Sequence, residues 1–213
     1  VLLDAGMRVA ISGRNLEDAQ KVAADLGDES KAIGIQSDVT NFEHEQKAIQ
    51  KVVEHFGQVD VVVANAGLGT FAPVDELSIE DWHQMINTNL NGVFHTLKAS
   101  VDELKKSKGY YITIASLAGT NFFEKASGYN ATKFGVVGFT QAAMLDLRKY
   151  DIKVSTIMPG SVATNFNNHL PTDSDKWKTQ PEDIGQLVLD LLKMNPRTLP
   201  SKIEVRPTRP DLK

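Results

Sequence analysis

Tyr129 and Lys133 lie four residues apart in the segment Tyr-Asn-Ala-Thr-Lys. On a helix this spacing places two side chains on one face, about 6 Å apart. A tyrosine ordinarily has a pKa of about 10, which is too high for ready proton exchange near neutral pH. A neighbouring ammonium favours the phenolate and lowers that pKa. The pair could therefore act as a general acid and base, although a solvated Tyr–Lys pair on a helix surface has the same spacing.

Four further sites carry residues suited to chemistry. Ser116 ends an apolar segment, where its hydroxyl could bond to a substrate carbonyl or cap a helix. Asn65-Ala66-Gly67 and Pro159-Gly160 each follow another apolar segment, and each could equally form a plain turn. Asn89 lies within Asn-Thr-Asn-Leu-Asn-Gly, a poor helical sequence unless one asparagine has a role or solvates the face. All of these sites together point to one active site.

The elements that would position these residues alternate along the chain. Apolar periodicity predicts strands at residues 8–12, 32–36, 59–64, 110–115, 153–158 and 203–206. It predicts helices at residues 16–26, 41–56, 78–107, 127–150 and 181–194. Parallel strands joined by helices indicate an α/β fold, a doubly wound parallel sheet in three αβα layers and a single domain over residues 1–213. Such sheets bind ligands beyond the carboxyl ends of their strands, where the candidate residues lie.

Composition excludes several classes of protein. The 213 residues carry a formal net charge of −4, which argues against a nucleic-acid partner. The absence of cysteine excludes disulfides and thiolate chemistry, and no metal site is expected. No apolar run approaches the roughly 20 residues of a membrane span, so we expect a cytoplasmic protein with no membrane partner.

The motifs resemble those of the short-chain dehydrogenase/reductase family over essentially the whole chain. Seven phrases occur in the family's order and spacing: SGRN, SDV, ANAG, NTNLNGVF, IASLAG, YNATK and MPGSVAT. The resemblance implies a Rossmann-like fold and a nicotinamide-dependent oxidoreductase that reduces a ketone or aldehyde, or oxidises the alcohol. It also implies that Tyr129 donates the proton and that Lys133 lowers its pKa and holds the nicotinamide ribose. Ser116 would polarise the substrate carbonyl, and Asn89 would hold a water linking Lys133 to solvent.

The resemblance also implies a set of cofactor contacts. Asp38 and Val39 would border the adenine. The adenosine-side ribose would lie near Asn65, Ala66 and Gly67. The carboxamide and pyrophosphate would meet residues that follow the fifth predicted strand, namely Pro159, Gly160, Val162 and Thr164.

Two departures from the family pattern stand out. Ala64 replaces the first asparagine of the family's Asn-Asn-Ala-Gly phrase, which we expect to be tolerated. The family's first strand and its Gly-x-x-x-Gly-x-Gly loop have no counterpart here, and a glycine turn at a helix N-terminus is what cradles a pyrophosphate. We therefore expect the natural gene product to carry roughly 20 to 30 further N-terminal residues.

The cofactor is predicted to be NADP(H) in preference to NAD(H). NAD-preferring relatives end the second strand of the family fold with an acidic residue that binds the ribose 2′-hydroxyl. Gly13 occupies that slot here, and Arg14, a permanent cation suited to phosphate, follows it.

The substrate, the assembly and one alternative function remain open. Phe71, Phe122, Phe123 and Phe166 suggest an apolar or aromatic carbonyl compound, although each could simply pack in a loop or the core. Residues 165–180 are expected to form a substrate lid. The helical segments at residues 91–105 and 132–147 resemble the family's dimer seam, which predicts a homodimer or homotetramer. The alternative is a non-catalytic dinucleotide sensor or scaffold of the same fold.

Overall fold

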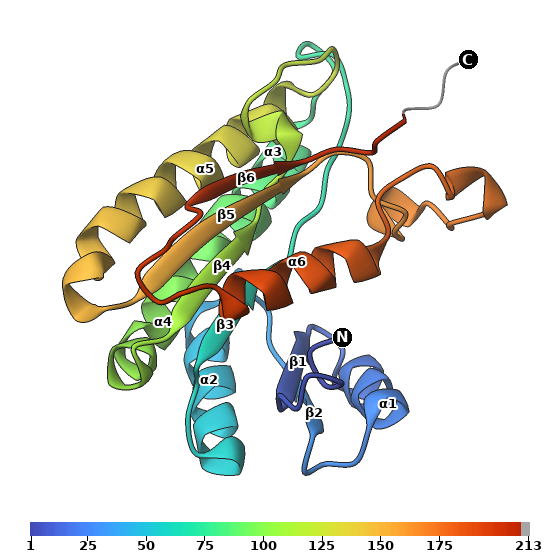
Figure 1. Cartoon of the computed structure of the whole chain (residues 1–213). Coiled ribbons are helices and arrows are strands. Elements are labelled where there is room, and N and C mark those ends of the chain that lie inside the picture. Colours follow the sequence, from blue (N-terminus) through green and yellow to red (C-terminus); the bar gives the residue numbers. More distant parts are fainter. Residues whose placement is uncertain (210–213) are drawn as a thin grey trace.

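Six parallel strands and six α-helices alternate along the computed structural model, which describes residues 1–209 (Figure 1). The strands are β1 (Val9–Gly13), β2 (Ala32–Gln36), β3 (Val61–Ala64), β4 (Tyr110–Ile114), β5 (Lys153–Pro159) and β6 (Lys202–Val205). Each predicted strand is present, with ends that differ by two residues at most. The α/β class with a parallel sheet is confirmed.

The strands belong to two parallel sheets. β1 pairs with β2, and the other four strands are hydrogen-bonded in the order β3-β4-β5-β6. The register places Val9 opposite Ala32 in the smaller sheet and Tyr110 opposite Lys153 in the larger one. Within residues 1–209, β1 and β3 form no backbone hydrogen-bond ladder with each other. The parallel sheet is therefore interrupted between β1 and β3.

Helices cover both faces of the larger sheet. Along β4 the side chains alternate, so Tyr111 packs among residues of α4 and α5, while Tyr110 and Ile112 pack against α6. The two layers are visible in Figure 1, where α4 and α5 lie on one side of β4 and β5 and α6 lies on the other. This arrangement is the three-layer αβα core that the sequence predicts.

In the part of the chain that the structure describes, six α-helices connect the strands. They are α1 (Leu16–Leu26), α2 (Phe42–Phe56), α3 (Ile79–Met85), α4 (Gly92–Ser107), α5 (Ser127–Leu147) and α6 (Pro181–Lys193). Asn15 and Asn41 accept hydrogen bonds from backbone N–H groups of the first turns of α1 and α2. No helix within residues 1–209 is long and apolar enough to cross a membrane.

The single helix expected over residues 78–107 is divided into three parts. A π-helical turn, Ile86–Asn91, separates α3 from α4. Three of its six residues are asparagines, which are poor α-helix formers, and π-turns are frequent at functional sites. Asn89 lies in this turn and is 1% exposed, so the wide turn brings a polar side chain into the interior.

Gly34 lets β2 approach α1 closely. A Cβ atom at this position would lie 2.3 Å from the backbone nitrogen of Gln20 and 2.4 Å from the carbonyl carbon of Ala19. No side chain fits between backbone atoms at those distances, so glycine is required for α1 to pack on the smaller sheet. The position of α1 matters for the site because the turn between β1 and α1 carries Arg14.

Candidate active site

Tyr129 and Lys133 meet at the carboxyl end of β4. Both lie in the first two turns of α5, and their exposed fractions are 8% and 5%. Lys133 Nζ donates a hydrogen bond of 3.3 Å to the carbonyl of Ile114, the last residue of β4. The same nitrogen lies 5.7 Å from the centroid of the Tyr129 ring. The structure therefore places this pair at the edge of the sheet where sequence analysis expects ligands.

Burial shifts the pKa values of both residues. It lowers the pKa of Lys133 from 10.5 to about 8, because the ammonium loses its hydration. It raises the pKa of Tyr129, and the side chain of Ser116 acts in the opposite direction. The expectation that Lys133 brings the pKa of Tyr129 below its ordinary value is wrong for this structure, since desolvation of the phenolate dominates. The lysine that was expected to supply charge is itself desolvated.

Ser116 lies two residues beyond the end of β4 and is half-buried. Its Oγ accepts a hydrogen bond of 3.1 Å from the N–H of Ala118, which makes it the cap of a short 3₁₀ turn, Leu117–Gly119. The capping interpretation is thus correct, and it is compatible with a second role because a hydroxyl has one donor hydrogen besides its acceptor lone pairs.

Asn89 joins the site to the loop that follows β3. Its Oδ1 accepts from the N–H of Leu68 at 2.9 Å, and its Nδ2 donates to the carbonyl of Leu68 at 2.8 Å. Nδ2 also donates to Thr132 Oγ1 on α5 at 3.0 Å. Both amide hydrogens are therefore bonded to protein, so Asn89 acts as a clamp between α5 and the loop. A bound water, as predicted, would have to use the remaining lone pair of Oδ1.

Sequence reasoning missed two polar residues of α5. Asn130, 7% exposed, donates from Nδ2 to the carbonyls of Ala118 and Asn121 at 2.6 and 2.7 Å. Thr132 is completely buried and accepts the hydrogen bond from Asn89. Asn130 therefore fixes the loop that carries Ser116, and Thr132 fixes the π-helical turn that contains Asn89. Both lie within Tyr-Asn-Ala-Thr-Lys, and their polarity on the face of a buried helix was the available signal.

A cleft of about 730 Å³ runs between the two sheets beside these residues. It brings together predicted cofactor residues from both halves of the fold: Arg14, Asp38, Val39, Asn65, Ala66 and Gly67. The backbone and hydroxyl of Thr40 hold the pKa of Asp38 below its ordinary value, and the charge of Arg14 contributes to the lowering. A Cβ atom at Gly67 would lie 3.4 Å from Asn89 Oδ1 and 3.6 Å from Lys133 Nζ. Glycine at this position therefore keeps the space beside both polar groups free of a side chain.

The predicted residues after β5 lie outside the lining of this cleft. The N–H of Gly160 donates to the carbonyl of Val205 on β6 at 2.8 Å, and Val162 pairs with Thr179 in an isolated bridge. Thr164 Oγ1 accepts from the N–H of Phe166 at 3.3 Å. The chain then turns back toward α5, where Phe166 contacts Tyr129.

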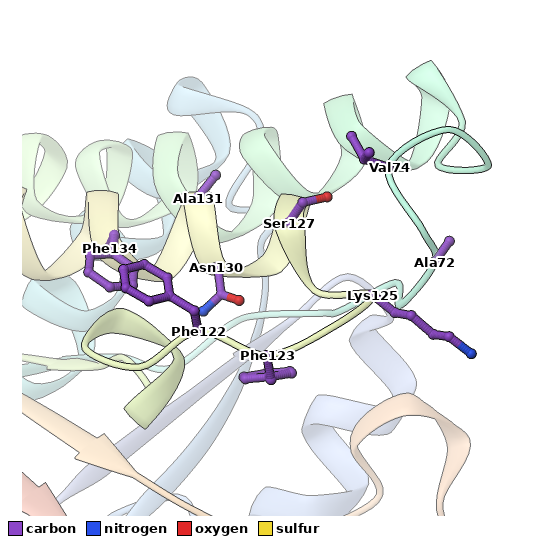
Figure 2. A pocket seen from close by; sticks show the side chains of 9 residues that line it. All are labelled: Ala72, Val74, Phe122, Phe123, Lys125, Ser127, Asn130, Ala131 and Phe134. Carbon is purple, nitrogen blue, oxygen red and sulfur yellow. The ribbon is translucent and has the colours of Figure 1, made fainter.

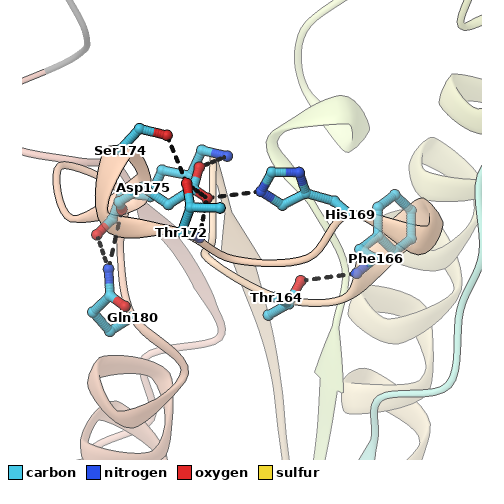
Figure 3. Close-up of polar contacts among 8 residues, drawn as sticks. Thr164, Phe166, His169, Thr172, Ser174, Asp175 and Gln180 are labelled. Carbon is cyan, nitrogen blue, oxygen red and sulfur yellow. Dashed lines mark hydrogen bonds and ion pairs between the residues drawn. The ribbon is translucent and has the colours of Figure 1, made fainter.

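The segment over residues 165–180 is held by its own polar contacts (Figure 3). Asp175 is buried and accepts from Lys178 Nζ at 2.6 Å and from the N–H of Thr172 at 2.9 Å, and its Oδ2 lies 2.8 Å from His169 Nε2. These contacts, Lys178 first, hold the pKa of Asp175 far below its ordinary value. The acidic charge at the centre of the predicted lid is therefore neutralised within the lid.

Three of the four phenylalanines named in the sequence analysis lie around Tyr129. The ring centroids of Phe71 and Phe166 are 5.4 and 5.8 Å from that of Tyr129, and Phe123 is 6.1 Å from Phe71. Phe122 is different, since it stacks on Phe134 with centroids 4.9 Å apart. Figure 2 shows Phe122 beside Phe134 over α5 and Phe123 pointing away from them. This second, apolar hollow of about 530 Å³ has Phe122, Phe123 and Phe134 in its lining.

Comparisons with known proteins agree with this arrangement. The family model described as short chain dehydrogenase matches residues 1–175. The chain belongs to the short-chain dehydrogenase family. It is an oxidoreductase of that family, and its Rossmann-like fold is the family's fold.

Individual relatives support the assignment. An uncharacterized oxidoreductase of Staphylococcus aureus strain MW2 is 33% identical over 208 residues, which cover 97% of this chain and 89% of the relative. The alcohol dehydrogenase of the archaeon Thermococcus sibiricus, solved with 5-hydroxy-NADP, is 31% identical with a TM-score of 0.90. The match covers 99% of this chain and 91% of that one. Serine dehydrogenase of Escherichia coli is 26% identical with a TM-score of 0.84, over 97% and 89% of the two chains.

Proposed function

We propose that this dehydrogenase reduces a small-molecule ketone or aldehyde to the alcohol with NADP(H), the reverse reaction being the oxidation. The observation that carries the proposal is the buried Tyr129–Lys133 pair beside Ser116 at the carboxyl end of β4. A phenol with a raised pKa keeps its proton at neutral pH, so it can deliver that proton to an oxygen that becomes basic during reduction.

In this proposal four side chains divide the tasks of the reaction. Tyr129 Oη donates its proton to the carbonyl oxygen, and the hydroxyl of Ser116 donates a hydrogen bond that polarises the same oxygen. Lys133 holds the nicotinamide ribose and re-protonates the phenolate, for which a pKa of about 8 is well suited. Asn89 positions the loop after β3 and holds a water on its free lone pair. The nicotinamide cofactor, when bound, supplies the hydride.

The residues present fit the two ends of a dinucleotide. At the adenosine end, the cleft offers the cation of Arg14, the ionised carboxylate of Asp38 and the exposed backbone of Asn65 and Ala66. At the nicotinamide end, Gly67 places no side chain beside the buried Lys133 Nζ. The segment after β5, with Pro159, Gly160, Val162 and Thr164, would border the carboxamide and pyrophosphate. These residues favour the binding of a dinucleotide over that of a mononucleotide, because polar groups lie at both the adenosine end and the nicotinamide end of the site.

NADP(H) is proposed over NAD(H) because of Gly13 and Arg14. Gly13 ends β1 without a carboxylate to repel a 2′-phosphate, and the exposed guanidinium of Arg14 follows it at the rim of the cleft. A cytoplasm that keeps NADPH reduced would then drive the reaction toward the alcohol. Residues 165–180 are proposed to act as the lid over the substrate, with Phe166 as its contact to Tyr129.

A homodimer or homotetramer is proposed as the assembly. Phe94 on α4 and Leu145 on α5 are 48% and 54% exposed, and these large apolar side chains lie on the two helices that resemble the family's seam. Light scattering at micromolar protein should give a mass of two or four chains. A monomer mass would contradict this part of the proposal.

The catalytic proposal is tested with a panel of carbonyl compounds. Consumption of NADPH is followed at its absorbance maximum, and binding of NADPH is followed separately by its fluorescence. We expect both binding and substrate-dependent oxidation. Binding without turnover of any carbonyl compound would support a sensor of dinucleotides and refute the catalytic proposal.

A further inference from the structure

Phenylalanines from three different loops form one surface beside Tyr129, and two of them contact its ring. Phe71 comes from the loop after β3, Phe123 from the loop after β4 and Phe166 from the loop after β5. Phe71 and Phe166 contact Tyr129 directly, at centroid distances of 5.4 and 5.8 Å, and Phe123 extends the surface from Phe71 at 6.1 Å. We call Phe71, Phe123 and Phe166 the aromatic wall.

The aromatic wall is half open to solvent, whereas the ring that it surrounds is not. The exposed fractions of Phe71, Phe123 and Phe166 are 42%, 49% and 38%, and that of Tyr129 is 8%. A contiguous apolar surface beside a reacting group is the usual form of a substrate subsite, because burying it against a ligand is favourable.

Gly69 makes the convergence possible. A Cβ atom at Gly69 would lie 3.0 Å from Phe166 Cζ, 3.1 Å from Tyr129 Cδ2 and 3.3 Å from Phe71 Cζ. Any side chain there would force at least one ring to move. The residues on either side are fixed, since Leu68 is bonded to Asn89 and the N–H of Thr70 bonds to the sulfur of Met85. The loop that carries Phe71 is therefore held in place on both sides of Gly69.

The three loop segments that carry the aromatic wall are uncharged. The segments 68–71, 121–123 and 164–167 contain no Asp, Glu, Lys, Arg or His. The charges that follow in the lid are paired with one another, with Asp175 bonded to Lys178 and His169 (Figure 3). A substrate carboxylate or phosphate packed against these segments would lose hydration without gaining a cation from them. Cations beside them include Lys125, which lines the hollow next to Phe123, and Lys133, whose Nζ lies 5.7 Å from the centroid of the Tyr129 ring.

We propose that the substrate is an aromatic ketone or aldehyde whose ring packs against Phe71, Phe123 and Phe166, with Gly69 as the residue that sets the width of the subsite. This inference rests on the proposed carbonyl reduction, because it places the carbonyl at Tyr129. Aromatic pairs in offset or edge-to-face geometry gain about 0.5–1.5 kcal/mol beyond area burial. A planar ring is thereby favoured over a saturated ring of equal size.

The test compares acetophenone with cyclohexyl methyl ketone, which differ in the aromaticity of the ring. Turnover with NADPH should give a higher kcat/KM for acetophenone, by roughly two- to twelvefold, expressed mainly in KM. Saturation-transfer NMR on the protein without cofactor should show contact of the acetophenone ring protons. Pyruvate, as a charged ketone, should be a poor substrate.

Substitutions of single phenylalanines test which side chains produce the preference for the aromatic ketone. Phe166→Ala should lower kcat/KM for acetophenone more than for the saturated ketone, and Phe166→Leu keeps an apolar side chain if the alanine variant is unstable. Phe122→Ala is the matched control, because Phe122 is 81% exposed and stacks on Phe134 instead of Tyr129. It should leave the selectivity unchanged.

The outcomes separate this inference from the proposed function. Equal efficiency with the two ketones, or equal effects of the Phe166 and Phe122 variants, would overturn the aromatic subsite and leave carbonyl reduction intact. Failure to turn over any carbonyl compound would refute the proposed function. In that case the NMR contact still decides the subsite: ring saturation that Phe166→Ala lowers more than Phe122→Ala does would support it, and no saturation, or an equal loss in the two variants, would overturn it.

Discussion

Asn89 bonds to both backbone polar groups of Leu68, 21 positions earlier in the chain, at 2.9 and 2.8 Å. The side-chain amide of Asn89 bonds to the N–H and carbonyl of Leu68 as the backbone of a neighbouring strand would. It therefore holds the loop after β3 in place. The clamp sets the position of Gly67 on one side and Gly69 on the other. The first opens the approach to Lys133, and the second lets the aromatic rings meet.

Asn89→Ala should therefore destabilise the protein and weaken the site. It leaves the N–H and carbonyl of Leu68 without their partner, at a cost of about 2 to 4 kcal/mol in the free energy of unfolding. Urea denaturation measures this loss. Asn91→Ala, in the same π-helical turn, removes an exposed side chain bonded to Asn87 and should change stability by less than about 0.5 kcal/mol. Equal losses in the two variants would contradict the role of the clamp.

Tyr129→Phe should abolish most of the turnover and keep cofactor binding. The change removes the proton donor and retains the ring that packs between Phe71 and Phe166. General acid catalysis contributes roughly 10²- to 10⁴-fold, so kcat should fall by that factor. NADPH fluorescence and kcat with one ketone are the two measurements. Tyr150→Phe alters an exposed tyrosine and should retain full activity; near-full activity of Tyr129→Phe would show that another group donates the proton.

The buried ammonium of Lys133 should make stability depend on pH in alkaline solution. The pKa is about 8 in the folded protein and 10.5 as the ordinary value. Between these values the unfolded chain binds the proton and the folded chain does not, so the free energy of unfolding rises with pH. From pH 7.5 to 9.5 the gain should be about 2 kcal/mol.

Lys133→Met should remove this gain, because methionine has no proton to lose. Urea denaturation at the two pH values measures the difference between the variant and the natural protein. Lys98→Met removes an exposed lysine on α4 and should leave the pH dependence as it is. A gain that persists in Lys133→Met would show that another group titrates.

The strands and the location of the site could be predicted from the sequence because short-range patterns determine them. Apolar runs marked all six strands, and Ser116 and Asn65 were identified because they follow two of them. Asn15 and Asn41 cap α1 and α2 through hydrogen bonds from backbone N–H groups two or three residues further along the chain. These features need no information about distant parts of the chain.

Features set by tertiary contact could not be predicted in this way. The role of Gly69 depends on three rings whose positions are 2, 60 and 97 residues away along the chain. The π-helical turn depends on the bonds of Asn89 to Leu68 and Thr132. The direction of the pKa shift of Tyr129 was wrong for the same reason, since the depth of burial is not visible from the spacing of Tyr129 and Lys133.

Arg14→Ala should reduce the preference for NADPH over NADH. A guanidinium that bonds to the 2′-phosphate contributes about 1.5–3 kcal/mol, so the natural protein should favour NADPH by roughly ten- to a hundredfold in kcat/KM. The carboxylate of Asp38 is ionised and interacts with the charge of Arg14. It remains in the variant, where its repulsion of the 2′-phosphate is no longer offset by the guanidinium. The ratio should therefore fall to about one or below. Steady-state kinetics with both cofactors gives the ratio, and Arg197→Ala, an exposed arginine beyond α6, serves as the control. Equal kcat/KM values for NADPH and NADH in the natural protein, or a ratio of the two that Arg14→Ala leaves unchanged, would show that Arg14 does not bind the 2′-phosphate.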